Sequence, residues 1–335
     1  MNYESPVTPI IGNPGCKPDM QLVTIDDVPE GSPGARLRSG EILHLLRAAR
    51  RGTIESWLPA SLTHILEGGE RALDVVRAIV ERVESTPAGN REALRRDGTL
   101  RAGDTRLQAP IPNPRLIVAA GLAYKSHLAE MAGTPAPPHP TAFLKSPNSL
   151  SWPDAHLSLP PQASEAVDYE GELACVFGRA CHRVSSSEAL SYLAGYTAAN
   201  DLSARDWAKS VWAATAPWEA RLTWEVNIMG KQLPGFTALG PVLTTTDDIP
   251  DPSALRLTTR LNGTVMQAAP ISDLIFPIAE VIAYLSCWYT FLPGDVLLTG
   301  TPSGVGIGRK PPVFIRAADV VEVEIDRIGT LRTHF

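Results

Sequence analysis

The sequence contains few cysteines, and no two of them are close enough in sequence to form a recognisable pair. The four cysteines are scattered along the chain without a Cys-x-x-Cys pair, which leaves no local pattern of a redox or zinc site. Cys175 and Cys287 stand in apolar surroundings, where a cysteine is most often a buried free thiol. We therefore predict that both are buried and unpaired, in a protein of the reducing cytoplasm.

Long apolar runs and basic tracts are also missing. No apolar stretch approaches the ~20 residues that a membrane-spanning helix needs, and residues 1–6 lack the basic and apolar parts of a secretory signal. The net charge is −6 and the pI is near 5.7, and no Lys/Arg-rich tract with interleaved aromatic residues occurs. We therefore expect no membrane and no nucleic-acid partner, and a small molecule as the ligand.

What the chain does have is length and many turn-forming residues. Its 335 residues, of which 44% are apolar and 20% charged, suffice for one large domain and a small one with a substantial core. Thirty prolines and 26 glycines are high for a helical protein. They favour many short strands joined by shaped turns.

The order of the local patterns divides the chain into three parts. Residues 1–20 hold four prolines and two glycines and are expected to form a flexible arm. Residues 21–110 indicate a small domain of strands followed by helices, the clearest over 70–84. Its polar end, residues 85–110, is interpreted as a connection. Residues 111–335 are the predicted main domain.

The main domain shows clear local signals. A buried strand is predicted over 114–121, and an Asn-Gly pair between alternating residues predicts a hairpin over 255–267. An apolar stripe predicts a helix over 273–287, and alternation predicts a strand over 320–325. Eight prolines in residues 132–165 predict a lid or a shaped loop around a pocket.

Three acids stand where they could share one cation. Glu170 and Glu172 lie two apart in a predicted strand over 167–177, which places both side chains on one face. Two carboxylates this close repel each other, which raises the pKa of one of them unless a cation lies between them. Asp201 follows a helix-like segment and a second strand, and could return to the same place. Such oxygen ligands suit Mg²⁺, Mn²⁺ or Ca²⁺, although Glu-x-Glu on a strand is more often a solvated face.

A histidine and a glutamate follow the first strand of the main domain. If a helix starts near Tyr124, His127 and Glu130 stand three apart on one face, where the carboxylate holds the imidazole in one tautomer and raises its basicity. Next to a metal, such a pair takes a proton from water. The alternative is an ordinary surface pair.

Two further segments offer groups for an anionic ligand. Lys145 lies in the proline-rich stretch and either meets a substrate anion or only snorkels to solvent. The loop at 300–306 is rich in glycine, and the Thr301 hydroxyl with nearby backbone amides could receive a carboxylate. This loop does not match a P-loop.

Five motifs, which keep the family's order along the chain, resemble those of the fumarylacetoacetate hydrolase family. They are Val-Asp-Tyr-Glu-Gly-Glu-Leu at 167–173, Asn-Asp-Leu-Ser-Ala-Arg-Asp at 200–206, Asn-Gly-x-x-x-Gln at 262–267, Pro-Gly-Asp-Val-Leu-Leu-Thr-Gly-Thr-Pro-Ser-Gly-Val-Gly at 293–306, and His-x-x-Glu at 127–130. The resemblance covers about residues 112–335, and the small N-terminal domain also looks like the one that many bacterial members carry.

The resemblance implies an α+β fold made mostly of strands. The catalytic part would be a mixed β-sandwich or roll, preceded by a small α/β domain, and the protein would be a homodimer. Mg²⁺ or Mn²⁺, with Ca²⁺ as a substitute in crystals, would be held by the residues that match the family's acids. These ligands are Glu170, Glu172 and Asp201.

The same resemblance implies roles for the remaining site residues. His127 and Glu130 would activate water, and Lys231 would be the cation near a developing enolate. Lys145, Arg205 and Thr301 are the predicted substrate contacts. The ligand would be a 2-oxo acid or a 1,3-diketo acid.

The first functional hypothesis is a metal-dependent hydrolase that cleaves a carbon–carbon bond in an acylpyruvate or a related 1,3-diketo acid. One alternative is a 2-oxo acid decarboxylase, or an enol–keto isomerase or hydratase, on the same metal site. Another is a catalytically weak relative that binds metal and ligand. The last is motivated by Ala208, where many hydrolases of the family have Gln, and by the altered segment 231–238.

Overall fold

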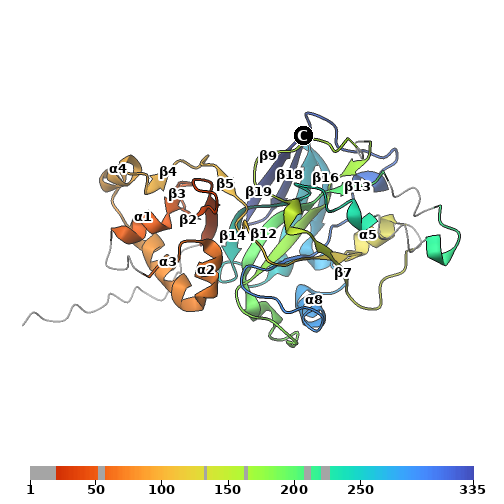
Figure 1. Ribbon diagram of the computed structural model, residues 1–335, viewed down its shortest axis with the longest axis horizontal. Helices are drawn as coiled ribbons and strands as arrows, with labels where there is room; N and C mark the ends of the chain where they lie inside the picture. The colour runs from red at the N-terminus through yellow and green to blue at the C-terminus, as the bar shows by residue number, and fades with distance from the viewer. Residues whose placement is uncertain (1–19, 52–56, 132–133, 162–164, 207–212, 220–226) are drawn as a thin grey trace, which may run out of the picture.

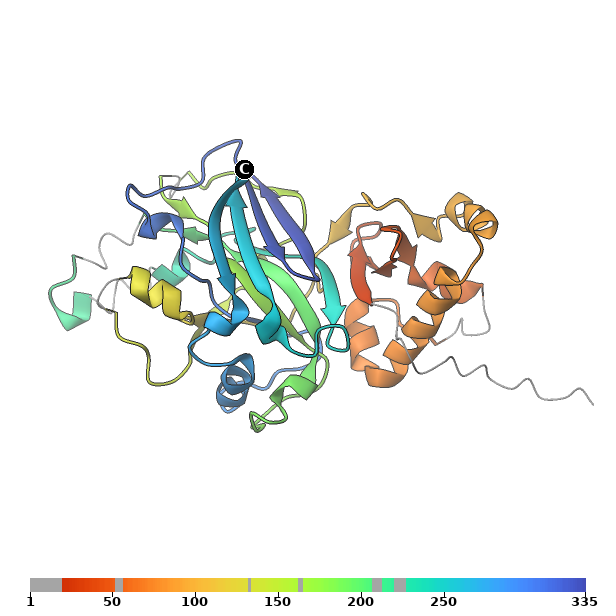
Figure 2. The same cartoon turned by 180° about the vertical axis from the view of Figure 1, so that it is seen from behind.

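The computed structural model describes residues 20–51, 57–131, 134–161, 165–206, 213–219 and 227–335. Most of the predicted arm at 1–20, and Ala208, therefore lie outside the described residues. Figures 1 and 2 show a smaller N-terminal region beside a larger one that is built mainly of strands. The predicted class, α+β and mostly strands with a small N-terminal α/β region, is confirmed.

The N-terminal region alternates short strands with a group of helices. Its elements are β1 Gln21–Ile25, β2 Ser32–Arg36, β3 Ile42–His44, α1 Leu45–Arg50, α2 Leu62–Glu67, α3 Gly69–Glu84, α4 Ala88–Arg96, β4 Leu100–Arg101 and β5 Leu107–Gln108. Of the apolar pattern that predicted α3, Leu73, Val76, Ile79 and Val83 are buried, whereas Ala78 is exposed.

The rest of the chain supplies the elements around the predicted site. They are β6 Ile117–Gly121, α5 Lys125–Glu130, β7 Thr141–Lys145, η1 Pro147–Ser149, β8 Leu150–Ser151, β9 Ala155–His156, β10 Val167–Asp168, β11 Gly171–Phe177, η2 Ala189–Tyr192, β12 Leu193–Asp201, β13 Ser203–Ala204, β14 Thr237–Thr245, η3 Pro252–Ala254, β15 Arg256–Leu261, β16 Thr264–Pro270, η4 Ile271–Asp273, α8 Ile278–Leu285, β17 Val296–Leu298, η5 Gly306–Gly308, β18 Val320–Ile325 and β19 Gly329–His334.

One large sheet runs through both regions. Its strand order is β4-β3-β2-β1-β14-β12-β11-β17-β6-β7, with β5 paired to β1 and β8 paired to β14. Since β1 pairs antiparallel with β14, the N-terminal strands extend the sheet that carries the acids. A second sheet, in the order β16-β15-β18-β19-β9, packs on it.

The two faces of the large sheet bury different cores, and β11 shows how. Leu173 and Cys175 face the core shared with the second sheet and with α8. Ala174 and Val176 point the opposite way, into the core shared with the N-terminal helices. This alternation follows from the period of two along a strand. Because β11 is buried on both faces, its sequence is an almost continuous apolar run.

Several sequence predictions hold in detail. The Asn-Gly pair at 262–263 joins β15 to β16, and both turn residues have positive φ, 51° and 78°, as a two-residue hairpin turn requires. The strand predicted over 320–325 is β18. The helix predicted over 273–287 is shorter, since α8 covers only Ile278–Leu285.

Other predictions were wrong. The stretch at 85–110 is not a plain connection, because it contains α4 and two short strands. In α4 only Leu94 is buried, so the apolar periodicity that would have revealed the helix is absent. The prediction for the proline-rich stretch at 132–165 was wrong only in part: the stretch contains β7, β8 and β9 as well as loop, but Thr134 and Phe143 from it do line a cavity. The helix-like segment before β12 is only the short 3₁₀ turn η2.

The two cysteines singled out from the sequence differ in exposure. Cys175 is a buried free thiol on β11, as predicted. Cys287 is exposed, contrary to the prediction, because it lies two residues beyond Leu285, the last buried residue of α8. Among the described residues, no helix has the length and apolar character needed to cross a membrane.

A buried histidine makes the N-terminal region sensitive to acid. His44 is 6% exposed, and its Nε2 lies 3.5 Å from Asp27 Oδ2. Burial lowers the pKa of His44 from 6.5 to about 4, although Asp27 acts in the opposite direction. The unfolded chain binds a proton near the ordinary value and the folded chain does not, so stability is lost as the pH falls between these two values.

We predict that His44→Gln reduces this acid sensitivity. At about pH 5 the linkage costs the native protein about 2 kcal/mol relative to neutral pH. Urea unfolding at about pH 7 and about pH 5 should therefore show a smaller loss in the variant, because glutamine does not titrate. His64→Gln, which removes an exposed imidazole from α2, is the matched control. Equal losses in wild type and His44→Gln would contradict the prediction.

Candidate metal centre and active site

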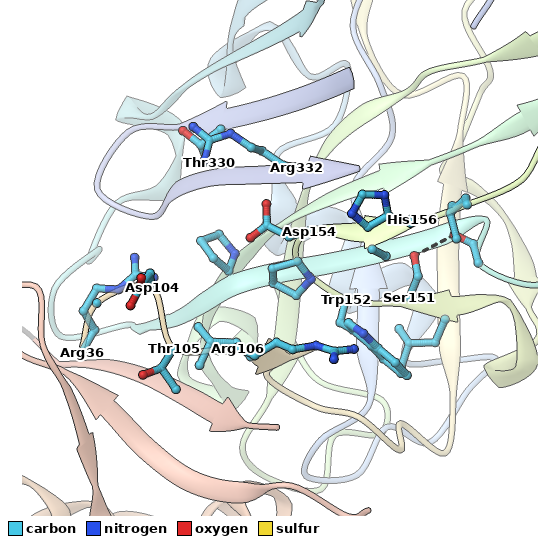
Figure 3. Close-up of a pocket in the computed structure, with 18 of the residues that line it drawn as sticks. Arg36, Asp104, Thr105, Arg106, Ser151, Trp152, Asp154, His156, Thr330 and Arg332 are labelled. Atoms are coloured by element: carbon cyan, nitrogen blue, oxygen red, sulfur yellow. Dashed lines mark hydrogen bonds between the residues drawn. The ribbon is translucent and has the colours of Figure 1, made fainter. Parts of the chain in front are cut away.

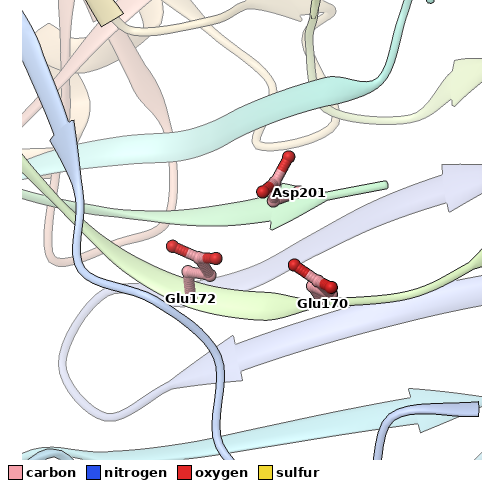
Figure 4. A group of neighbouring side chains, drawn as sticks. All are labelled: Glu170, Glu172 and Asp201. Atoms are coloured by element: carbon pink, nitrogen blue, oxygen red, sulfur yellow. The ribbon is translucent and has the colours of Figure 1, made fainter. Parts of the chain in front are cut away.

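Pairing between β11 and β12 brings the three predicted acids together. The register places Glu172 opposite Ala199, so that the start of β11 lies beside the end of β12, where Asp201 stands. Glu170 immediately precedes β11 and lies on the same side as Glu172 (Figure 4). Each of the three acids is buried, and each offers a carboxylate oxygen within 4.8 Å of the other two. The convergence predicted from the sequence is thus present.

Buried cations contact two of the three acids. Lys231 Nζ lies 2.5 Å from Glu170 Oε2 and 2.7 Å from Asp201 Oδ2, so one ammonium bridges both carboxylates. Glu170 also accepts a hydrogen bond from the Arg205 guanidinium, and Asp201 accepts one from the Lys145 ammonium. Burial would raise the pKa of Glu170, but Lys231 and Arg205 outweigh burial and lower it to about 2.

Glu172 is held differently. Its Oε2 accepts a hydrogen bond from the Gly300 backbone N–H at 2.7 Å, and no salt bridge to it occurs among the described residues. Burial raises the pKa of Glu172, and the neighbouring charges of Asp201 and Glu170 raise it further, well above its ordinary value. Glu172 is therefore the carboxylate that most lacks positive charge.

This donor set fits a hard divalent cation. Carboxylate oxygens are the ligands that Mg²⁺ and Mn²⁺ prefer, and these three are close enough to meet at one ion. A cation would also supply the charge that Glu172 lacks and so stabilise its ionised form. A buried cluster of acidic side chains is costly without such compensation.

The predicted dyad lies on α5, directly after β6. His127 Nδ1 is 3.4 Å from Glu130 Oε2. Glu130 Oε1 accepts a hydrogen bond from the Gly304 N–H at 3.0 Å, which ties the dyad to the glycine-rich loop. A side chain at Gly308 would lie against the Glu130 carboxylate and displace it, so the glycine lets the loop pass close to the dyad.

Arg205 is anchored by an acid to which the sequence interpretation gave no role. Asp168 is fully buried, and its Oδ2 lies 3.3 Å from Arg205 Nε. Asp168 also accepts hydrogen bonds from the backbone N–H groups of Gly306 and Ile307, at 2.6 and 3.2 Å. Asp168 thereby joins Arg205, and through it Glu170, to η5. The one feature of the sequence that could have marked Asp168 is its position inside the motif at 167–173.

Lys145 contacts one of the three acids. Its side chain is buried, and its ammonium donates to Asp201 Oδ1 and to the backbone carbonyls of Lys231 and Phe236. These three contacts use all three N–H groups of the ammonium. Lys145 does not line the cavity described below. Lys145 therefore contacts Asp201 and stands outside the cavity lining, and its contact with a substrate stays a prediction.

Thr301 is fixed from two sides. Its hydroxyl donates to the Gly171 carbonyl at 3.0 Å and accepts a hydrogen bond from Gln267 Nε2 at 2.7 Å. The sequence interpretation gave Gln267 no role, although the residue ends the third motif. The hairpin of β15 and β16 thus orients a side chain of the glycine-rich loop.

A cavity of about 540 Å³ collects most of the predicted site residues. The predicted residues that line it are His127, Glu130, Glu170, Glu172, Asp201, Arg205, Lys231 and Thr301. Its volume lies within the usual range for small-molecule sites. Phe143, Asn227, Arg309 and Lys310 line the same cavity and were not predicted. They lie outside the recognisable motifs, so no local pattern marked them.

A second, larger cavity of about 1160 Å³ lies elsewhere, where the N-terminal region meets the second sheet (Figure 3). Arg36 and Arg106 line it from the N-terminal side, and Asp154, His156 and Arg332 line it from the other side. It contains none of the predicted site residues. The smaller cavity, with its acids and its dyad, is therefore the candidate active site.

Comparisons with known proteins agree with the motifs. The family model described as fumarylacetoacetate (FAA) hydrolase C-terminal matches residues 116–335. Human oxaloacetate tautomerase FAHD2A, mitochondrial, is 36% identical over 275 residues, which cover 82% of this chain and 79% of the human protein. Oxaloacetate tautomerase YisK from Bacillus subtilis (strain 168) is 38% identical over 230 residues, which cover 68% of this chain and 72% of YisK.

A solved structure extends the likeness to nearly the whole chain. Maleylpyruvate hydrolase from Sphingobium sp. SYK-6, in complex with manganese(II) ion and pyruvate, matches with a TM-score of 0.67 and 25% identity. The match covers 94% of this chain and 98% of that one, so it includes the N-terminal region. The resemblance drawn from the five motifs is thus confirmed: the chain belongs to the fumarylacetoacetate hydrolase family.

Proposed function

We propose that the protein is a divalent-metal-dependent isomerase that interconverts the keto and enol forms of oxaloacetate. The observation that carries the proposal is that one cavity joins a carboxylate triad to a histidine–glutamate dyad. Two relatives of high coverage, from human and from Bacillus subtilis, are named oxaloacetate tautomerases. Isomerisation therefore replaces the carbon–carbon bond hydrolysis of the first hypothesis as the main proposal.

The reaction moves one proton and shifts one double bond, and no group is added to or removed from the substrate. The keto form loses a proton from C3, the 2-oxo oxygen gains one, and the carbon–carbon double bond forms between C2 and C3. Glu170, Glu172 and Asp201 would hold Mg²⁺ or Mn²⁺. The bound ion would supply Lewis-acid polarisation of the 2-oxo group.

His127 is the proposed proton carrier. If Nδ1–H donates to Glu130 Oε2, the free lone pair lies on Nε2, which is then the basic atom of the ring. Glu130 stabilises the imidazolium that forms when Nε2 accepts the proton from C3. Because the Gly304 N–H fixes Glu130, the dyad keeps one orientation while the proton moves.

Lys231 and Arg205 are proposed to keep the acids ionised and in place. Burial would lower the pKa of Lys231, but Asp201 and Glu170 raise it above its ordinary value, so the ammonium stays charged. Two of its N–H groups meet Glu170 and Asp201, and one can meet the enolate oxygen. Thr301 lines the same cavity, and it is proposed to contact the substrate carboxylate through its backbone N–H, because its hydroxyl proton is already donated to the Gly171 carbonyl.

Hydrolysis of an acylpyruvate is the second candidate. It is supported by the maleylpyruvate hydrolase among the similar structures. The same dyad would then take its proton from water, and the hydroxide would attack the distal carbonyl of the diketo acid. The homodimer, the cytoplasmic location and the choice between Mg²⁺ and Mn²⁺ stay predictions.

We predict that His127→Gln slows tautomerisation by about 10²- to 10⁴-fold in kcat, because a positioned general base contributes that much. The loss of the enol absorbance of oxaloacetate in the ultraviolet measures the rate. The variant should still bind Mn²⁺ and oxalate, because His127 is not a proposed ligand. His64→Gln, on the exposed face of α2, is the matched control.

The outcomes separate the candidates. Wild-type rates in His127→Gln would remove the dyad from the mechanism. A wild-type protein that leaves oxaloacetate unchanged but splits an acylpyruvate would establish the second candidate in place of the first. If neither substrate reacts with Mg²⁺ or Mn²⁺ present, the third hypothesis, a weak relative that only binds metal and ligand, is supported.

We predict that Mn²⁺ affinity rises with pH. The pKa of Glu172 is raised above its ordinary value, so the metal-free protein binds a proton there at pH values where a free glutamate is ionised. Metal binding must displace this proton, and the displacement becomes easier as the pH rises. Calorimetric titration at about pH 5.5 and about pH 7.5 should show tighter binding at the higher value.

Glu172→Gln provides the test of the assignment. It removes one ligand and the proton that competes with the metal, so binding should weaken and lose most of its pH dependence. Glu67→Gln, an exposed glutamate at the end of α2, is the matched control. Unchanged Mn²⁺ affinity in Glu172→Gln would show that the ion does not bind at the triad.

A further inference from the structure

The net charge of the buried cluster limits how many carboxylates of a substrate the site can neutralise. Counted at full ionisation, the buried cluster has four carboxylates and three cations. The carboxylates belong to Asp168, Glu170, Glu172 and Asp201, and the cations to Lys145, Arg205 and Lys231. The protein alone therefore leaves one negative charge in this cluster. A divalent cation turns it into one positive charge, which a single substrate carboxylate cancels.

Oxaloacetate carries a second carboxylate, for which the buried cluster has no matching charge. This carboxylate, C4, is attached to C3, the carbon that exchanges the proton. If His127 takes the proton from C3, the C4 carboxylate lies one bond further on, next to the His127–Glu130 dyad and away from the metal-binding end of the substrate. A cation on the cavity wall at that place would bind it, since an anion transferred from water needs a compensating partner.

Lys310 stands at such a place. The chain passes the Glu130 carboxylate at Gly308, two residues before Lys310. Lys310 lines the cavity and is exposed, and its ammonium has no hydrogen-bond or ion-pair partner within the described ranges. The neighbouring Arg309 differs, because its guanidinium donates to the backbone carbonyls of Gly304 and Met266. Arg309 is thus bound to the loop, whereas Lys310 is free for a ligand.

We propose that Lys310 binds the distal carboxylate of the substrate and makes the site selective for dicarboxylic 2-oxo acids. This inference rests on the proposed function and deepens it by naming the substrate class. An ammonium at the cavity mouth acts as a movable point charge with three donors, which suits a carboxylate that changes position as C3 changes from tetrahedral to planar. Monocarboxylic 2-oxo acids gain nothing from this contact.

The test compares two unreactive ligands in the presence of Mn²⁺. Oxalate has no group beyond the proposed metal-binding end, whereas 3,3-difluoro-oxaloacetate has a distal carboxylate and no proton at C3. Lys310→Met should weaken binding of difluoro-oxaloacetate about tenfold or more, as expected for a lost charged hydrogen bond. Oxalate affinity should change by less than about twofold. Lys310→Arg, which keeps the charge, should retain most of the affinity for difluoro-oxaloacetate.

Lys125→Met is the matched control, because Lys125 is another exposed lysine, at the start of α5, and does not line the cavity. It should leave both affinities unchanged. Equal effects of Lys310→Met on the two ligands, or no effect on either, would overturn the inference. Since binding is measured without turnover, a wild-type protein that binds difluoro-oxaloacetate through Lys310 but does not tautomerise oxaloacetate would contradict only the proposed reaction.

Discussion

Repulsion among three buried carboxylates is the constraint on which this site depends. Strand pairing brings together Glu170, Glu172 and Asp201. Each ionised carboxylate would be more stable in water, or beside a cation, than buried next to the other two. Lys231 relieves two of them, while Glu172 receives only a backbone N–H. The protein thus leaves a defined deficit of positive charge at one carboxylate. A divalent ion removes that deficit, which is why the geometry favours metal binding over a simple internal ion-pair network.

The two halves of the site are supported in different ways. The acids stand on or beside β11 and β12, which lie inside the large sheet and are held by backbone hydrogen bonds on both sides. The dyad stands on the six-residue helix α5 and depends on contacts with the loop that follows β17. Gly304 supplies one of these contacts at a φ of 101°, where a side chain would collide with the Met266 carbonyl. The loop therefore sets where the His127–Glu130 pair stands relative to the acids.

The sequence predicted that Glu170 and Glu172 share a face, and that His127 and Glu130 do, because each pair is separated by a short, regular spacing. Period two along a strand and period 3.6 along a helix convert such spacings directly into shared faces. Lys145 could not be placed this way: its partners, Asp201 and two carbonyls, are 56 or more residues away, and only the fold shows that its charge is already used. The helix α4 was missed for a related reason, since its salt bridges to Glu41 and Glu84 leave no apolar pattern.

Isomerisation and hydrolysis can use the same site because they first differ in the group from which the base takes its proton. Both require a polarised 2-oxo group and a base fixed by Glu130. They differ in whether Nε2 of His127 meets a C–H group of the substrate or a water molecule. The substrate decides this by the way it fills the cavity, whose wall includes Phe143, Asn227 and Lys310. The motifs supply the acids and the dyad, which both reactions would use, and so they specify the family. Selection between the two reactions would then rest on wall residues outside the motifs, such as Asn227 and Lys310.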